Sequence, residues 1–144
     1  MSMTINYNSL DYNFFCGYFP ELKEKIIAEN DWLGENLPHC LFGNILNPLV
    51  VKLLKQDNYI TNPILEKIFH MYEEFAEYGD TETKNLLQVT LLEYLWDDYI
   101  TYSRALKLMG RHTRDINKNI ADYLSVPKEV NYRRNNRKSK KFTE

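Results

Sequence analysis

Residues 57–98 constrain the fold most strongly, because apolar side chains recur there with helical spacing beside a large excess of acid. This segment holds ten carboxylates and two lysines, a net charge of −8. With successive residues placed about 100° apart, residues 63–78 gather their apolar side chains on one broad face. That face consists of Leu65, Ile68, Phe69, Tyr72, Phe75 and Ala76. The pattern predicts a surface helix that buries one face and shows its acids to solvent.

The next segment, residues 81–98, is predicted to be a helix at the centre of the domain. Apolar side chains surround most of its circumference: Leu86, Leu87, Val89, Leu91, Leu92, Leu95 and Trp96. Only Thr90, Glu93 and Asp97 form a narrow polar strip. A helix that is apolar on nearly all sides is normally buried.

Prolines, glycines and capping residues divide the rest of the chain into further helices. The expected helices cover residues 9–16, 20–30, 38–46, 47–56, 103–109 and 113–124. Strand signals are weak, because no Asn-Gly or Asp-Gly turn separates alternating apolar runs. We therefore expect an all-α fold: a single compact domain of about seven or eight helices around the buried central helix, within residues 5–126.

Charge is distributed unevenly along the 144 residues, which are enough for one domain with a conventional core. Residues 1–130 carry 19 acids and 12 bases, a net charge of −7. Residues 131–144 carry six bases and one acid, a net charge of +5. We therefore expect an acidic body followed by a basic, disordered tail over residues 127–144.

The first ten residues lack the basic and apolar regions of a signal peptide. Apolar runs fall far short of the roughly 20 residues that span a membrane. Cys16 and Cys40 have apolar neighbours and no CxxC spacing, so buried thiols are expected rather than a disulfide or a zinc site. The sequence predicts a cytoplasmic protein with no cofactor, no metal and no membrane partner, and it specifies no oligomeric state.

Few residues suggest catalysis. Glu66 and His70 lie one helical turn apart, and a second helix would have to supply Glu93 and Asp97 to form an acid–base or metal site. A solvated surface pair is the favoured interpretation of Glu66 and His70. Phosphate-binding glycine loops, GxSxG and HExxH are all absent from the sequence, so an enzyme is not expected.

Acidic side chains also recur along one stripe of residues 63–80, with Lys67 as the one nearby base. Carboxylates one turn apart repel each other, which favours a compensating use such as a contact with a basic protein. The candidate contact residues are Glu66, Glu73, Glu77, Tyr78, Asp80 and Asp98. The alternatives are a merely solvated stripe and an interface elsewhere, for instance at the helix starts near His39 and Asn47.

Several short signatures occur in order between residues 18 and 124. They are Tyr18-Phe19-Pro20-Glu21, Leu37-Pro38-His39, Phe42-Gly43-Asn44-Ile45, Tyr78-Gly79-Asp80, Val89 to Leu95 with Asp97-Asp98, and Met109-Gly110 with Thr113. In this order the chain resembles small all-helical bacterial domains that look like immunity proteins of contact-dependent growth inhibition and related polymorphic-toxin systems.

The resemblance implies a protein that binds a cognate toxin domain and occludes its active site, without catalytic residues of its own. Toxins of these systems are frequently nucleases with basic surfaces, which an acidic protein fits. Two alternatives stay open. One is a nucleic-acid-binding protein that uses the tail with Arg111 and Arg114, although an acidic body makes nucleic acid an unexpected partner. The other is a helical enzyme that uses the Glu66, His70, Glu93 and Asp97 set.

Overall fold

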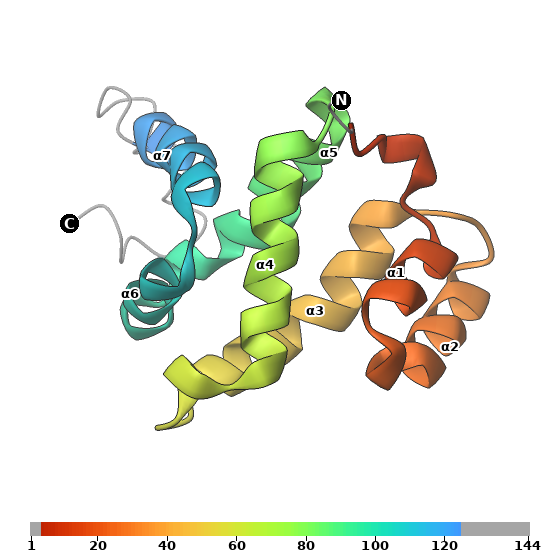
Figure 1. The fold of residues 1–144 in the computed structure, drawn as a ribbon, viewed down its shortest axis with the longest axis horizontal. Helices are drawn as coiled ribbons and strands as arrows, with labels where there is room; N and C mark the ends of the chain where they lie inside the picture. The colour runs from red at the N-terminus through yellow and green to blue at the C-terminus, as the bar shows by residue number, and fades with distance from the viewer. Residues whose placement is uncertain (1–3, 125–144) are drawn as a thin grey trace.

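Helices account for most of residues 4–124, the part of the chain that the computed structural model describes (Figure 1). The α-helices in this range are α1 (Tyr12–Tyr18), α2 (Lys23–Leu33), α3 (Pro38–Leu54), α4 (Pro63–Tyr78), α5 (Thr81–Asn85), α6 (Tyr99–Leu108) and α7 (Arg111–Leu124). Shorter or irregular helical segments are η1 (Tyr7–Ser9), η2 (Pro20–Leu22), η3 (Tyr59–Thr61), η4 (Leu86–Leu92) and η5 (Glu93–Asp97). No strand forms within residues 4–124, which confirms the predicted all-α fold. The predicted basic tail, residues 127–144, lies outside the described residues.

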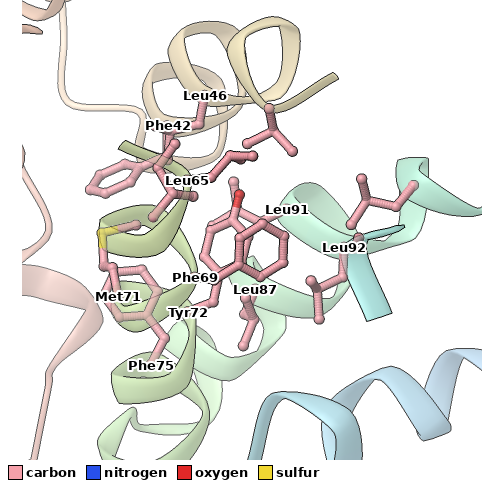
Figure 2. Close-up of a cluster of buried hydrophobic side chains, with 14 of the residues drawn as sticks. Phe42, Leu46, Leu65, Phe69, Met71, Tyr72, Phe75, Leu87, Leu91 and Leu92 are labelled. Atoms are coloured by element: carbon pink, nitrogen blue, oxygen red, sulfur yellow. The ribbon is translucent and has the colours of Figure 1, made fainter. Parts of the chain in front are cut away.

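Helix α4 crosses the middle of the molecule, with α1 and α2 on one side and α6 and α7 on the other (Figure 1). Helix α3 runs from the side of α1 and α2 past α4 and contacts α6. Its predicted apolar face is buried, with Leu65, Ile68, Tyr72 and Phe75 fully inaccessible to solvent. Figure 2 shows this face meeting apolar side chains of α3 and of the segment that follows α5. Burial of this face supplies much of the drive for folding, at roughly 1.5–3 kcal/mol for each large side chain.

The predicted central helix over residues 81–98 is buried but is not one regular α-helix. Leu86, Leu87, Leu91 and Leu92 are fully buried, as expected, whereas Val89 is 43% exposed. After α5 the chain continues as the π-helical segment η4 and then as the 3₁₀ segment η5. A π-helix makes i→i+5 hydrogen bonds, and the change from this pattern to the 3₁₀ pattern of η5 interrupts the ladder, so backbone groups near the change can bind side chains from elsewhere.

Helix α3 provides such partners where it packs against η4. The Nδ2 atom of Asn47 donates a hydrogen bond to the backbone oxygen of Thr90 at 3.0 Å. The Nδ1 atom of His39 lies 2.5 Å from Oγ1 of Thr90. Gly43 allows this close approach, because a Cβ atom there would lie 2.9 Å from Cγ2 of Thr90. The irregular η4 segment is therefore held by side chains of α3.

The predicted break between residues 46 and 47 does not occur, and α3 continues through Pro48. Asn47 points across to Thr90 instead of capping a new helix. By contrast, Asn62 caps α4 as predicted, because its Oδ1 atom accepts hydrogen bonds from the backbone N–H groups of Ile64 and Leu65.

Other differences from the sequence-based expectation lie at the helix ends and at the cysteines. Asp11 rather than Ser9 caps the first helix, since its Oδ1 atom accepts from the N–H group of Phe14. Both cysteines are free thiols; Cys16 is half-buried, and Cys40 is exposed rather than buried as expected. Among residues 4–124, none of the helices combines the length and the apolar character needed to cross a bilayer.

Candidate functional site

Glu73, a predicted partner contact, joins α4 to the start of α7. Its Oε2 atom accepts hydrogen bonds from the backbone N–H of His112 at 2.9 Å and from the His112 ring at 2.7 Å. Its Oε1 atom accepts from the backbone N–H and the hydroxyl of Thr113, at 2.9 and 2.8 Å. The expectation that Glu73 points to water is therefore wrong, because Glu73 caps α7 from a neighbouring helix.

The electrostatics of Glu73 follow from this capping. Partial burial by itself raises the pKa of the Glu73 carboxyl, but the hydrogen bonds from His112 and Thr113 outweigh it and lower the pKa to about 2. Gly110 belongs to the same arrangement, since a Cβ atom at this position would collide with the Glu73 carboxylate. Gly110 and Thr113, two residues of the sequence signatures, thus lie at the Glu73 carboxylate.

Asp80 and Asp98, two further predicted contacts, also cap helices. Asp80 accepts from the backbone N–H of Thr83 at 2.9 Å and from that of Tyr7 at 3.0 Å. Hydrogen bonding to Thr83 is the largest cause that lowers the pKa of Asp80. Asp98 accepts from the backbone N–H of Thr101 at 2.8 Å, at the start of α6. Three of the six predicted contact residues therefore have a structural role.

The other three predicted residues, Glu66, Glu77 and Tyr78, are exposed on α4. We call Glu66 and Glu77 the acidic stripe; they lie eleven residues apart, which places them on the same side of the helix. Tyr78 follows directly and is 43% exposed, and the charge of Glu77 raises its pKa. These residues are available to a partner.

The described part of the chain holds one group of three potential metal ligands. It consists of Glu73, Glu77 and His112, whose ligand atoms lie within 4.8 Å of one another. Both oxygens of Glu73 are already engaged by two donors each. The start of α7 also carries partial positive charge, which disfavours a cation. The group is better explained as the junction of α4 and α7.

The catalytic alternative needs Glu66, His70, Glu93 and Asp97 in one place. Within residues 4–124, these side chains form no such ligand group. His70 pairs with Glu74, at 3.4 Å between Nε2 and Oε2, rather than with Glu66 as predicted.

The nucleic-acid alternative relied on Arg111 and Arg114 beside the tail. The guanidinium group of Arg114 donates to the backbone oxygens of Leu106 and Met109 at the end of α6. Arg114 therefore stabilises a helix C-terminus, where a cation is favourable. Arg111 is exposed at the start of α7.

A groove of about 1220 Å³ lies along α3, and none of the six predicted contact residues lines it. Its floor is formed by residues of α3 between His39 and Val51. Glu29 and Trp32 of α2 line the groove together with Thr90 and Tyr94, which follow α5 in sequence. The Trp32 side chain is 79% exposed. We refer to this feature as the α3 groove.

The α3 groove includes His39 and Asn47, the two residues near which the sequence suggested an alternative interface. Trp32 and Tyr94 were not predicted there, because their position beside α3 depends on how the helices pack. One signal is present in the sequence: between Lys25 and Lys52 the chain contains three acids and no lysine or arginine, and one of these acids, Glu29, lines the groove. A tryptophan in the polar run Glu29-Asn30-Asp31-Trp32 is a second signal.

The chain matches the family model described as a domain of unknown function, DUF7674, over residues 12–124. This match extends from the start of α1 to the end of α7. Comparisons with curated proteins and with solved structures give no significant match. The chain therefore belongs to the DUF7674 family.

Proposed function

We propose that this protein neutralises a basic toxin domain, of the nuclease class, by binding it and occluding its active site. It would act in the cytosol of the producing cell, as immunity proteins of contact-dependent growth inhibition and related polymorphic-toxin systems do. The observation that carries the proposal is the negative net charge of the described residues. Residues 4–124 contain 18 acids and 11 lysines or arginines, a net charge of −7.

The position of the acids supports binding to a basic protein. Glu73, Asp80 and Asp98 are committed to helix starts, whereas Glu66 and Glu77 face solvent. A nuclease cleft presents lysines and arginines to phosphate groups, and exposed carboxylates can pair with the same cations. Such pairing speeds association and makes it dependent on salt.

Exposed aromatic residues supply the apolar contact that charge alone lacks. Trp32 is 79% exposed and Tyr78 is 43% exposed. Tryptophan and tyrosine are enriched among the residues that dominate the energy of protein interfaces. An acidic surface with exposed aromatic side chains therefore favours a protein partner over nucleic acid.

Co-expression tests this proposal. The chain is produced in a bacterial host together with the toxin domain encoded beside its gene, and an unrelated toxin domain serves as the control. The chain should restore the growth of cells that produce the neighbouring toxin domain and should not restore the growth of cells that produce the unrelated one. With purified proteins, inhibition should reach completion at equimolar amounts, because occlusion is stoichiometric.

Other outcomes would contradict the proposal. Complete inhibition at far less than equimolar amounts of the chain would indicate that the chain is an enzyme that inactivates the toxin domain. Absence of protection would reject the immunity function, and tight binding of single-stranded RNA at physiological salt would then favour the nucleic-acid alternative.

A further inference from the structure

We propose that the α3 groove binds a short segment of a protein partner, one that carries a bulky apolar side chain next to a lysine or arginine. The identity of that partner as a toxin domain rests on the proposed function. Four features of the groove favour this docking role: its shape, its exposed tryptophan, its charge and the hydrogen bonds among its lining residues.

The shape of the groove fits a short peptide segment. Its floor follows α3 from His39 to Val51, which corresponds to about 18 Å of helix. About five residues of extended chain cover that length. The groove is shallow and open to solvent, and its volume of about 1220 Å³ leaves room for side chains of such a segment.

Trp32 supplies an apolar contact at the edge of the groove. The side chain is 79% exposed, so a partner can bury most of it without displacing any other part of the fold. Pro48 and Val51 add apolar surface to the floor. Burial of a tryptophan against an aliphatic or aromatic side chain typically dominates the energy of a small interface.

The charge of the groove selects a cationic segment. Glu29 lines the groove, and its Oε2 atom accepts a hydrogen bond from Nδ2 of Asn44 at 2.9 Å. Burial lowers the pKa of His39 below its usual 6.5, so its ring adds no positive charge at neutral pH. Of the residues that the structure describes, Glu29 is the one acidic residue that lines the groove, and no lysine or arginine lines it. A basic residue of the partner is therefore attracted, and an acidic residue is repelled.

Hydrogen bonds join the lining residues of the groove to one another before any partner arrives. Asn47 and His39 bind Thr90, which also lines the groove, at 3.0 and 2.5 Å. The hydroxyl of Tyr94 donates to the backbone oxygen of Asn47 at 3.4 Å. A preformed site loses little conformational entropy on binding, which favours affinity.

Selection from a random peptide library tests the groove without knowledge of the partner. Displayed peptides of about twelve residues, longer than the segment that the groove accommodates, are selected on the immobilised full chain. The enriched peptides should combine lysine or arginine with a bulky apolar residue. Their affinity for the purified chain is then measured by fluorescence anisotropy.

Matched variants decide where the selected peptides bind. Trp32→Ala should weaken binding by about tenfold or more, whereas Tyr99→Ala, which removes a 76% exposed aromatic ring outside the groove, should change it less than about twofold. Glu29→Gln keeps an acceptor for Asn44 and removes the charge, so it should weaken binding and reduce its salt dependence. Glu24→Gln, an equal charge change at an exposed position of α2 outside the groove, should leave both the affinity and its salt dependence unchanged.

Failure of the groove and failure of the proposed function give different results. Equal effects of Trp32→Ala and Tyr99→Ala, no enrichment of any peptide, or enrichment of acidic peptides would each overturn the groove as a docking site, even if co-expression protects cells. Peptide binding that depends on Trp32, without protection from the toxin domain, would support the groove and reject the immunity function.

Discussion

Glu73 and Glu77 occupy neighbouring turns of α4 and have the same side chain, but their surroundings give them different roles. The first turn of α7 donates two backbone N–H groups to Glu73. Glu77 lies farther from α7, with its Oε1 atom 3.8 Å from Nδ1 of His112, and is exposed. Helical periodicity places both residues on one stripe and cannot show which of them another helix covers.

Replacement of Glu73 by glutamine should destabilise the fold. The amide NH₂ group would face N–H donors of His112 or Thr113, so at least one hydrogen bond would be lost at a half-buried position. We expect the free energy of unfolding to fall by about 1–3 kcal/mol. Urea unfolding measures this change. Glu77→Gln is the matched control and should stay within about 0.5 kcal/mol of the parent chain.

The stability that Glu73 contributes should depend on pH. Its pKa falls from the usual 4.5 to about 2 in the folded chain, so the folded state favours the charged carboxylate. The contribution is fully present above pH 4.5 and is lost as the pH falls toward 2. The unfolding free energies of the parent chain and of Glu73→Gln should therefore converge over this interval. Glu77 and His112 are present in both proteins, so their titration affects both equally. A difference in unfolding free energy that stays constant with pH would therefore contradict the role assigned to Glu73.

At the scale of elements, two identical Asn-Pro pairs are both predicted to start a helix, and only one of them does. Asn62-Pro63 starts α4, and this helix has the bounds that the sequence predicts. Asn47-Pro48 lies inside α3, because Asn47 hydrogen-bonds to Thr90, a residue 43 positions away in the sequence. Fold class and the buried faces depend on local periodicity and were predictable. The irregular η4 segment and the α3 groove depend on contacts between distant residues and were not.

Close packing of α3 against η4 predicts the effect of substitutions at Gly43. Gly43→Ala should destabilise the chain by about 1–3 kcal/mol, because the new Cβ atom would lie 2.9 Å from Cγ2 of Thr90. Thr90→Ser removes Cγ2 and keeps the hydroxyl, so the double variant should recover part of this loss. A double-mutant cycle from urea unfolding measures the coupling.

Gly17→Ala is the control for this cycle. Gly17 lies in α1, and a Cβ atom added there would have no neighbouring atom within 4 Å. Alanine is favoured over glycine in a helix, so this substitution should be neutral or stabilising by up to about 1 kcal/mol. Additive effects of Gly43→Ala and Thr90→Ser would show that the contact between α3 and η4 is not tight.

At the scale of the whole molecule, the proposed roles of the acidic stripe and the α3 groove affect binding in different ways. Charge on exposed residues acts over a distance of about 8–10 Å and mainly raises the association rate. An apolar anchor such as Trp32 acts after contact and mainly lowers the dissociation rate. Kinetic measurements can therefore separate the two surfaces in a single complex.

The double variant Glu66→Lys/Glu77→Lys should slow association with the neighbouring toxin domain and weaken its dependence on salt. Its unfolding free energy should change little, because both side chains are exposed. Glu24→Lys/Asp122→Lys changes the net charge equally at exposed positions of α2 and α7, and it is the control for overall charge. Surface plasmon resonance at low and high salt gives the rates. If only the α4 variant associates more slowly, the acidic stripe is the surface that attracts the toxin domain. If both variants slow equally, the attraction comes from the net charge, and the stripe is not part of the interface.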